Sequence, residues 1–514
     1  MGLGLAVIEA PSIEGSEKAH AEGRLDAAEA GYMRLLALAP DDAAAANNMA
    51  AICLEAGRAA AAEGFARQAL KNAADSPQAA GNLAMALCEQ ARLAEGLPLL
   101  QRLVDSGRAS ARTHANLLFV QNYDPDRDAA TIRRTAEAWA ARFAPAGGPQ
   151  DLPRSAAAAT AGRRLRVGYV SPDFRIHATL NFLLPLLQAH DRGKVEVHLF
   201  AELSGTDAAS AMYRAVADGW HETAGRSDEE LAALVREIGI DLLVDLAGHT
   251  SAARLGLFAR RPAPVQLTYP IGFGGTTGMA QFDGVIADPV LAPEVAETGF
   301  TEPVLRLDGP WAAFRPQSPF PNVGALPAVA NGHVTFGCFS RVIRLNDRVL
   351  DCWAEILSGL PGSRLLLNNR VLQEAAVRDR FLAAFQARGI AADRLDLVYV
   401  TPQAASLSHY GQVDITLDPF PHSAATTVAE SLWMGVPVVS LRGAIPVDAV
   451  EPPTVSIGRK RDFTPCEFDV ICRTTGAGAV PEAFGICTCH FRGNPLARDG
   501  CVWGVRVLGR VLLV

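Results

Sequence analysis

A three-residue pattern recurs at intervals of 34 residues near the start of this chain, and it limits the possible folds more than any other feature. Gly or Ala, then Arg, then Leu or Ala stand at residues 23–25, 57–59 and 91–93, and further small residues follow each of them in phase. The surrounding sequence, residues 1–145, is rich in Ala and Leu and has few strand-forming residues. Small residues at a fixed spacing allow two helices to approach closely, so the pattern predicts stacked pairs of helices.

This pattern resembles the tetratricopeptide repeat, which has a period of about 34 residues. Ala-rich helices whose spacing agrees by chance are the alternative interpretation. The resemblance implies an α-helical repeat array over residues 1–145 with a groove for extended peptide, so we expect it to bind a protein or peptide. Residues 146–163 combine Pro and Gly with a run of Ala, and they are predicted to form a linker.

After the linker, strand-like and helical segments alternate in two series, over residues 164–325 and 330–443. The predicted strands lie at 164–170, 195–200, 241–246, 265–268, 334–339, 364–367, 397–400, 414–417 and 437–441. Alternation of this kind predicts an α/β fold with parallel sheets covered by helices on both faces, that is, two Rossmann-like domains. Ligands of such domains bind at the carboxyl ends of the strands.

Composition excludes several classes of protein. The chain has 514 residues, with 47 Lys and Arg against 55 Asp and Glu, so its formal net charge of −8 argues against a general nucleic-acid-binding surface. No run of about 18 apolar residues could cross a membrane, and no basic segment precedes the first apolar stretch as in a signal peptide. Nine Cys, an odd number, favour a reducing compartment. We therefore predict a cytoplasmic protein with no membrane or nucleic-acid partner.

Polar residues follow predicted strands of the first Rossmann-like domain. His177 comes after the first strand and could exchange a proton near neutral pH, or could be a capping or structural histidine. Gly248 permits a tight turn that would present His249 after another strand, although a simple turn would look the same. Residues 272–278 are rich in Gly and include Thr276, whose hydroxyl could help to bind a phosphate or a sugar, although many Gly-rich turns bind nothing.

A fourth segment, residues 417–427, joins a strand of the second domain to the start of a helix. The N–H groups and the dipole of a helix N-terminus attract anions such as a diphosphate, and Thr426 and Thr427 would add hydroxyl donors. One of these threonines could instead merely cap the helix. Glu430, one turn further, could accept hydrogen bonds from a ribose diol.

Together, the repeat array and these segments resemble the protein O-N-acetylglucosaminyltransferase family, which includes bacterial members and the plant Spindly-type proteins. The resemblance covers roughly residues 20–443, and its strength lies in the order and spacing of several motifs. They stand at residues 166–177, 244–250, 258–266, 275–278, 417–422 and 432–439. It implies a two-domain GT-B glycosyltransferase fold that transfers a sugar from a nucleotide donor to Ser or Thr hydroxyls of proteins with inversion. UDP-N-acetylglucosamine is the favoured donor substrate, and neither a metal nor a cofactor is expected.

The resemblance also implies roles for individual residues. His177 matches the active-site histidine of the family and is a candidate base or positioning group, and His249 is the second candidate catalytic residue. The residues expected to bind the donor are Thr276, Arg344, Gln403, Thr426, Thr427 and Glu430.

Two of these positions depart from the family pattern. Arg344 stands where the family usually has a Lys that contacts the donor diphosphate, so the charge is kept but its geometry changes. Gln403 stands where the family offers basic or His residues to the donor. N-acetylglucosamine and fucose both remain open as the donor sugar, because each is presented on a nucleoside diphosphate.

Residues 444–514 match nothing in the family. They lack helical periodicity, and five of the nine Cys lie there. We interpret this tail as a foreign reading frame fused to a truncated second domain. An inactive relative that serves as a repeat-based peptide-binding scaffold is therefore the alternative function. A nucleotide-sugar epimerase on the same fold is a third interpretation, which the repeat array disfavours.

Overall fold

The structure is a computed structural model. It describes residues 12–144, 162–269, 271–289, 291–400 and 407–441, apart from the side chains of 294–296, and the backbone of three short strands further on. The chain divides into two compact units, and the first holds the residues up to Leu117 together with Gln373–Arg378. The second holds Leu118–Leu372 and the residues from Asp379 onward.

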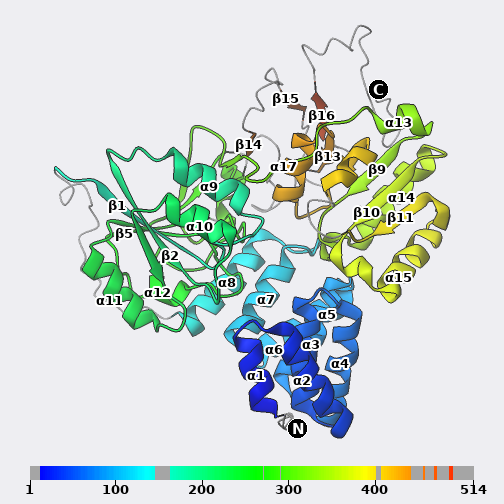
Figure 1. The fold of residues 1–514 in the computed structure, drawn as a ribbon. Coiled ribbons are helices and arrows are strands. Elements are labelled where there is room, and N and C mark those ends of the chain that lie inside the picture. The colour runs from blue at the N-terminus through cyan, green and yellow to red at the C-terminus, as the bar shows by residue number, and fades with distance from the viewer. Residues whose placement is uncertain are drawn as a thin grey trace, which may run out of the picture. The chain divides into compact units, whose positions relative to one another are not determined.

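Residues 12–144 form eight helices, as the repeat pattern predicted (Figure 1). Their bounds are α1 Ile13–Ala21, α2 Leu25–Leu38, α3 Ala43–Glu55, α4 Ala59–Asn72, α5 Pro77–Glu89, α6 Leu93–Asp105, α7 Ala111–Gln121 and α8 Ala129–Phe143. Helices α3, α5 and α7 begin 34 residues apart, and so do α2, α4 and α6. The predicted helical array is therefore confirmed, and the boundary between the two compact units falls within α7.

Small residues produce the close helix packing of the array. Gly57 turns the chain between α3 and α4 with a φ of 68°, and Ala91 takes the equivalent place between α5 and α6 with a φ of 60°. A Cβ added to Gly96 of α6 would lie 2.4 Å from Sγ of Cys88 and 2.6 Å from the carbonyl oxygen of Ala84, both in α5. The backbones of α5 and α6 can approach this closely only because Gly96 has no side chain.

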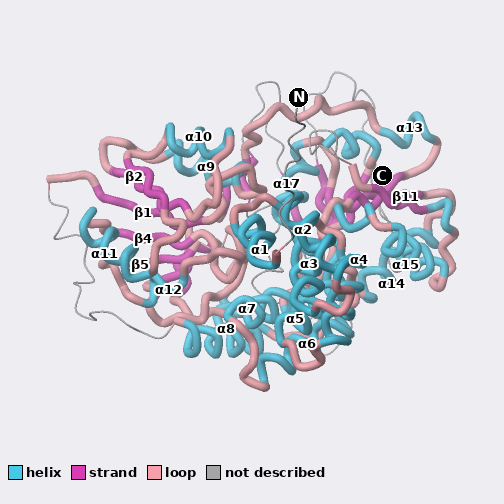
Figure 2. The backbone as a smooth tube through the Cα atoms, turned by 60° about the horizontal axis from the view of Figure 1, so that its bottom comes forward, coloured by secondary structure: helices cyan, strands magenta, loops and turns pink. Residues whose placement is uncertain are grey.

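The first Rossmann-like domain is a parallel seven-stranded sheet with the strand order β3-β2-β1-β4-β5-β6-β7. The strands are β1 Leu165–Ser171, β2 Val195–Ala201, β3 Gly219–Glu222, β4 Leu242–Asp245, β5 Val265–Thr268, β6 Gly284–Ala287 and β7 Val304–Arg306. The helices are α9 Leu180–Ala189, α10 Ala208–Ala215, α11 Asp228–Ile238, α12 Leu255–Ala259 and the 3-10 helix η1 Glu294–Gly299. Figure 2 shows α9 and α10 along one side of this sheet and α11 and α12 along the other, as the alternating pattern predicted.

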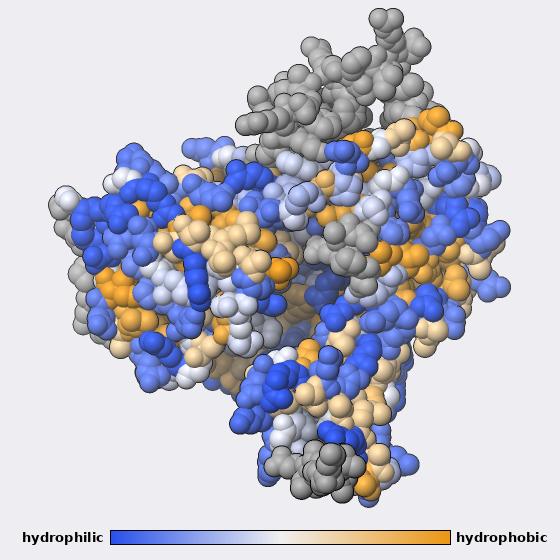
Figure 3. Space-filling model, in the orientation of Figure 1, coloured by the Kyte–Doolittle hydropathy of each residue, from blue (hydrophilic) through white to orange (hydrophobic). Residues whose placement is uncertain are grey.

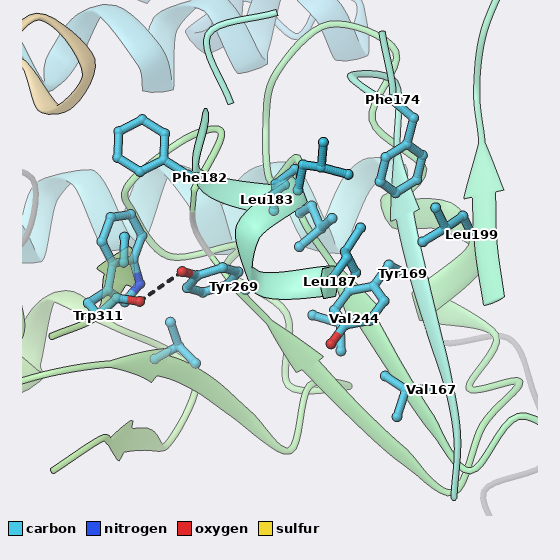
Figure 4. Packing of buried hydrophobic residues seen from close by; sticks show 14 of the residues in the cluster. Val167, Tyr169, Phe174, Phe182, Leu183, Leu187, Leu199, Val244, Tyr269 and Trp311 are labelled. Carbon is cyan, nitrogen blue, oxygen red and sulfur yellow. Dashed lines mark hydrogen bonds between the residues drawn. The ribbon is translucent and has the colours of Figure 1, made fainter. Parts of the chain in front are cut away.

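Apolar side chains of β1 and α9 form part of the core of this domain (Figure 4). Leu183 and Leu187 of α9 and Tyr169 of β1 are all buried there. The hydroxyl of Tyr269 donates a hydrogen bond to the carbonyl of Trp311 at 2.7 Å, so its polar end is satisfied inside the core. This packing fixes the carboxyl end of β1, where the segment that carries His177 begins.

The second Rossmann-like domain has the strand order β11-β10-β9-β12-β13-β16-β15. Its strands are β9 Thr335–Cys338, β10 Arg364–Asn368, β11 Leu395–Val398, β12 Ile415–Leu417 and β13 Val438–Ser440, which are parallel, and β16 Gly485–Cys489 and β15 Phe468–Ile471, which are added antiparallel. Its helices are α13 Pro327–Asn331, η2 Val342–Arg344, α14 Asp347–Gly359, η3 Arg370–Gln373, α15 Ala375–Gln386, η4 Ala392–Arg394, η5 His409–Gln412 and α17 Ala425–Trp433.

The described parts of the predicted tail are short strands. β15 and β16 extend the second sheet, and β14, Val455–Ile457, pairs with β8, Ala312–Phe314. Strands here agree with the absence of helical periodicity after residue 443.

Some large apolar side chains are exposed at the surface. The large exposed ones include Leu38, Ile176 and Val329, and the face in Figure 3 mixes hydrophilic with hydrophobic residues. Single exposed apolar side chains are ordinary for a protein surface. Within the described residues, no helix combines the length and the hydropathy that crossing a bilayer requires.

Candidate functional site

His177 lies in the segment between β1 and α9, beyond the carboxyl end of the strand. Its side chain is 36% exposed. Nδ1 lies 3.0 Å from the hydroxyl of Thr179, 3.4 Å from the backbone nitrogen of Thr179 and 3.6 Å from the carboxylate of Asp173. Burial lowers the pKa of His177, and the charge of Asp173 acts in the opposite direction. The loop therefore holds the ring by Nδ1, while Nε2 has no hydrogen-bond partner among the described residues.

The start of α10 anchors the loop that carries His177. The backbone N–H of Ile176 donates to Oδ2 of Asp207 at 2.7 Å, while Oδ1 of the same carboxylate caps α10 by accepting the N–H of Ser210 at 3.0 Å. The hydroxyl of Ser210 donates in turn to the carbonyl of Phe174 at 2.9 Å. Burial raises the pKa of Asp207, but the N–H donors outweigh it and keep this pKa below its ordinary value. One carboxylate thus fixes both the helix and the loop.

His249 follows β4 and is buried inside the second compact unit. Its Nε2 donates to the carbonyl of Thr277 at 2.8 Å, since a carbonyl can only accept. The ring lies edge-on to Trp139 of α8 and to Phe273, with centroids 4.7 and 5.4 Å apart. Burial raises the pKa of Asp245, in the turn before His249, to about 6. One nitrogen of His249 is thus engaged in holding the Gly-rich loop.

Thr276 is buried in that Gly-rich loop, and its hydroxyl donates to Oε2 of Glu302 at 2.6 Å. The other oxygen of Glu302 accepts the N–H of Thr277 at 2.7 Å and also its hydroxyl. Gly278 has a φ of 73°, and a Cβ there would lie 2.2 Å from the carbonyl carbon of Ala136 in α8. The loop therefore closes around a buried carboxylate, and the Thr276 hydroxyl already has a protein partner.

Helix α17 begins with open N–H groups. Its N-cap is Ala424, which has no side-chain hydrogen bond to offer, so neither Thr426 nor Thr427 caps the helix. Both threonines are half-buried in the first turn. Oδ1 of Asp418 accepts the N–H of Ala424 at 3.0 Å and ties the helix start to the end of β12. Residues 425–427 have no acceptor for their backbone N–H groups among the described residues, which is the arrangement that binds anions.

Arg344, in η2 after β9, has no carboxylate within ion-pair distance among the described residues. Its Nη1 donates to Oγ of Ser340 at 3.0 Å, its Nε is buried without a partner, and no ion pair is formed within the described ranges. Burial raises the pKa of Asp418, and the positive charge of Arg344 is among the opposing influences, so the two side chains lie close together. A guanidinium with open donors beside the segment that starts α17 adds to the attraction for a phosphate.

His422 lies in the loop between β12 and α17. Its Nδ1 donates to the carbonyl of Ser423 at 2.7 Å. The ring of Tyr123 stacks on it, with centroids 4.9 Å apart and 30° between the planes. Burial, followed by the charge of Arg344, lowers the pKa of His422 well below its ordinary value. The imidazole is therefore neutral near pH 7, and its Nε2 is a hydrogen-bond acceptor.

Glu430 is buried in α17, and Oε2 accepts the hydroxyl hydrogen of Tyr410 at 3.1 Å. The ring of Tyr410 stacks on Phe339, with centroids 3.8 Å apart. Burial raises the pKa of Glu430 to about 7, and the hydrogen bond from Tyr410 opposes this. Near neutral pH the carboxyl group can thus either donate or accept a hydrogen bond.

The structure brings some of the predicted residues together and leaves one undescribed. Arg344, Thr426 and Thr427 are grouped around the loop between β12 and α17, whereas Gln403 lies outside the described residues. Sequence reasoning missed Asp207 and Tyr123. The capping pattern from 207 to 210 could have revealed Asp207, but nothing local marks Tyr123. Where the chain is described, no group of three or more His, Cys, Asp or Glu side chains could hold a metal ion.

A row of asparagines in the first compact unit was also missed. Asn48, Asn82 and Asn116 are 34 residues apart and occupy the sixth position of α3, α5 and α7, so they lie at equivalent places on the first helix of three successive repeats. All three are half-buried. Nδ2 of Asn82 donates to Oδ1 of Asn47 at 3.0 Å, which shows that neighbouring repeats meet along this face. An amide side chain can donate and accept at once, as the backbone of an extended peptide requires.

Comparison with known proteins gives one family match and several relatives. Residues 149–308 match Glycosyl transferase family 41. Proteins named as probable UDP-N-acetylglucosamine–peptide N-acetylglucosaminyltransferase SPINDLY, from Petunia hybrida and Arabidopsis thaliana, are 34% and 35% identical over 288 residues. These matches cover 55% of this chain and 31% of each relative, so the chain spans about a third of their length. A solved mutant of the Thermobaculum terrenum O-GlcNAc transferase is 32% identical, with a TM-score of 0.80 and 86% of each chain covered.

Proposed function

Because the chain belongs to the O-GlcNAc transferase family, we propose that it is a protein O-glycosyltransferase. It transfers N-acetylglucosamine from UDP-N-acetylglucosamine to Ser or Thr hydroxyls of polypeptides, with inversion at the anomeric carbon, and it works in the cytoplasm. The nucleotide sugar is its donor substrate, and its partner is the acceptor protein.

The observation that carries this proposal is the group of N–H and hydroxyl donors at the start of α17. Arg344 forms no ion pair among the described residues and uses only Nη1 in a protein hydrogen bond, and the first turn of α17 has uncapped N–H groups beside two threonine hydroxyls. Helix N–H groups, hydroxyls and a guanidinium are the donors that phosphate oxygens prefer. This combination supports binding of the diphosphate of a nucleotide sugar.

The same groups suit the leaving group of the reaction. As the bond from the anomeric carbon to the diphosphate oxygen breaks, that oxygen gains negative charge. Fixed donors stabilise developing charge better than water does, because they need no reorganisation. Arg344, Thr426 and Thr427 would therefore favour the transition state over the bound donor, and Glu430 would bind the ribose hydroxyls.

His177 is the proposed proton acceptor on the first domain. The oxygen of the acceptor hydroxyl attacks the anomeric carbon, and its proton passes to Nε2 of His177 in the tautomer that carries its hydrogen on Nδ1, facing Thr179 and Asp173. The lowered pKa keeps the imidazole neutral near pH 7, as a base requires. The carboxylate of Asp173, 3.6 Å from Nδ1, would stabilise the imidazolium that forms. His249 and Thr276 would act on the same side by keeping the Gly-rich loop in place.

The acceptor polypeptide is proposed to bind along the asparagine row of the array. Asn48, Asn82 and Asn116 repeat on equivalent helices, so an extended backbone can meet a similar amide at each repeat. Recognition of backbone groups would leave selection of the reacting Ser or Thr to the catalytic domains.

Incubation with UDP-N-acetylglucosamine or GDP-fucose and a cell extract, followed by intact-mass analysis of proteins, tests the function. We expect an added N-acetylhexosamine with the first donor. Arg344→Met should weaken UDP binding by about 10- to 100-fold, since it removes charge-assisted hydrogen bonds of about 1.5–3 kcal/mol. Arg348→Met is the matched control, because Arg348 is exposed and pairs with Asp126 instead. No transferred sugar with either donor, together with retained peptide binding, would favour the scaffold function.

A further inference from the structure

We propose that Tyr123 is a positioning residue of the donor site, supplied by the helical part of the chain. Tyr123 lies between α7 and α8, outside both Rossmann-like domains. It belongs to the same compact unit as the residues it contacts in the second domain. This inference rests on the proposed function, since that function gives Arg344 its role in binding the donor.

The contact with His422 is the first of two that support the inference. The Tyr123 ring covers one face of the imidazole at 4.9 Å between centroids. The Ser423 carbonyl accepts the hydrogen of Nδ1, so the imidazole is held both in its plane and on its face. His422 lies between Asp418, which binds the N-cap of α17, and the first turn of that helix. A ring that fixes His422 therefore also restrains the loop that sets the direction of the open N–H groups.

The second contact is with Arg344, whose guanidinium carbon lies 5.8 Å from the centre of the Tyr123 ring. Attraction between a cation and an aromatic face holds the guanidinium without using any of its N–H groups. Nη1 is bound to Ser340, and no other polar partner is formed within the described residues. Tyr123 therefore restrains the guanidinium without engaging the N–H donors that Ser340 does not already bind.

The Tyr123 ring is itself immobilised. Only 1% of the residue is exposed. The ring of Phe119 meets it edge-on at 5.2 Å, and the guanidinium of Arg341 lies 5.2 Å from the Phe119 ring. The backbone N–H of Tyr123 donates to the carbonyl of Val120 at 3.0 Å. A side chain fixed in this way can transmit its position to both donor-site residues.

The test compares UDP binding by calorimetry in four forms of the full chain: unmodified, Tyr123→Phe, Tyr123→Leu and Tyr123→Met. We expect Tyr123→Phe to bind as the unmodified chain does, because the aromatic face is kept. Tyr123→Leu and Tyr123→Met should bind UDP about 3- to 10-fold more weakly, a change typical of losing one cation–aromatic contact. In transfer assays the KM for the donor should rise by a similar factor, whereas a general loss of folded protein would lower kcat and leave KM unchanged.

Asp126→Asn is the matched control. Asp126 lies in the same α7–α8 segment as Tyr123, and its substitution removes the ion pair with Arg348 of α14. Asp126 contacts none of the donor-site residues, so UDP binding should be unchanged. Thermal unfolding shows which variants fold, and the flexible Met side chain refills the space if Leu does not support folding. Equal UDP affinities for the unmodified chain and a folded non-aromatic variant would overturn the inference alone. Absence of UDP binding by the unmodified chain would overturn the proposed function and the inference with it.

Discussion

Asp207→Asn separates the two tasks of one carboxylate and tests how the loop of His177 is held. Asn is as good an N-cap as Asp, so it can still accept the N–H of Ser210 and preserve α10. The other end of the side chain would then be an amide NH₂ facing the N–H of Ile176, donor against donor. The bond lost measures 2.7 Å to a charged acceptor, and such a bond contributes about 1.5–3 kcal/mol.

Losing this hydrogen bond destabilises the loop that carries His177 rather than the whole fold, so we expect the substitution to lower the catalytic rate. A cost of about 2 kcal/mol raises the population of displaced loops about 30-fold relative to the anchored one. We expect kcat for sugar transfer to fall by about tenfold or more, because displacement of His177 by even one ångström disturbs proton transfer. UDP affinity should not change, since Asp207 belongs to the first domain.

Steady-state transfer kinetics with a peptide acceptor, together with thermal unfolding, measure this prediction. Asp128→Asn is the control, because Asp128 caps α8 through Thr131 and anchors no loop. The kcat of this variant should stay within about twofold of the unmodified value.

Folding lowers the pKa of Asp207. The contribution of this carboxylate to stability is therefore complete above about pH 4 and is lost as the pH falls further. An unchanged kcat for a folded Asp207→Asn chain would refute the anchoring argument.

Three further predictions concern other parts of the molecule. Thr427→Ala should weaken UDP binding about fivefold through loss of one hydroxyl donor. His177→Ala should reduce sugar transfer by at least about 100-fold and leave UDP binding nearly unchanged. Unchanged transfer in both variants would contradict the site assignment. Because burial raises the pKa of Glu430 to about 7, the unmodified chain should lose stability as the pH rises from about 4.5 to 7. Glu430→Gln should reduce that slope in denaturant titrations, leaving the part that Asp245 contributes through its own raised pKa, and an identical slope would contradict it. Gly278→Ala should lower the free energy of unfolding by about 1–3 kcal/mol, because the added Cβ would overlap the backbone of α8 and because residue 278 has a positive φ. An unchanged free energy of unfolding would show that α8 can move to make room for the Cβ.

Features that depend on local spacing could be predicted from the sequence. The 34-residue period predicted the helical array, and the alternation of strands and helices predicted both Rossmann-like domains, because each element forms from its own neighbours. The open N-terminus of α17 was predictable for the same reason: a strand, a loop and a helix start are consecutive in the chain. Arg344 was found only through the family resemblance.

Contacts between distant segments left no such pattern. The hydroxyl of Thr276 could be singled out in a Gly-rich loop, but its partner Glu302 lies 26 residues away, in a segment without any motif. Tyr123 and His422 meet across most of the chain, and an aromatic residue after a helix is more often part of a core. Asp207 is intermediate, because its capping pattern is local while its bond to Ile176 is not.

The two histidines show how much the surroundings add to a sequence pattern. Both follow a strand of the same parallel sheet, so their local positions look alike, and only the family resemblance marked His177 as the candidate base. In the structure, Nε2 of His249 donates to a carbonyl and its ring lies between Trp139 and Phe273. His177 instead has Nδ1 held by its own loop and Nε2 unpartnered within the described ranges. A base needs an accessible lone pair, so we propose His177 as the acceptor of the hydroxyl proton, with His249 keeping the neighbouring loop in place.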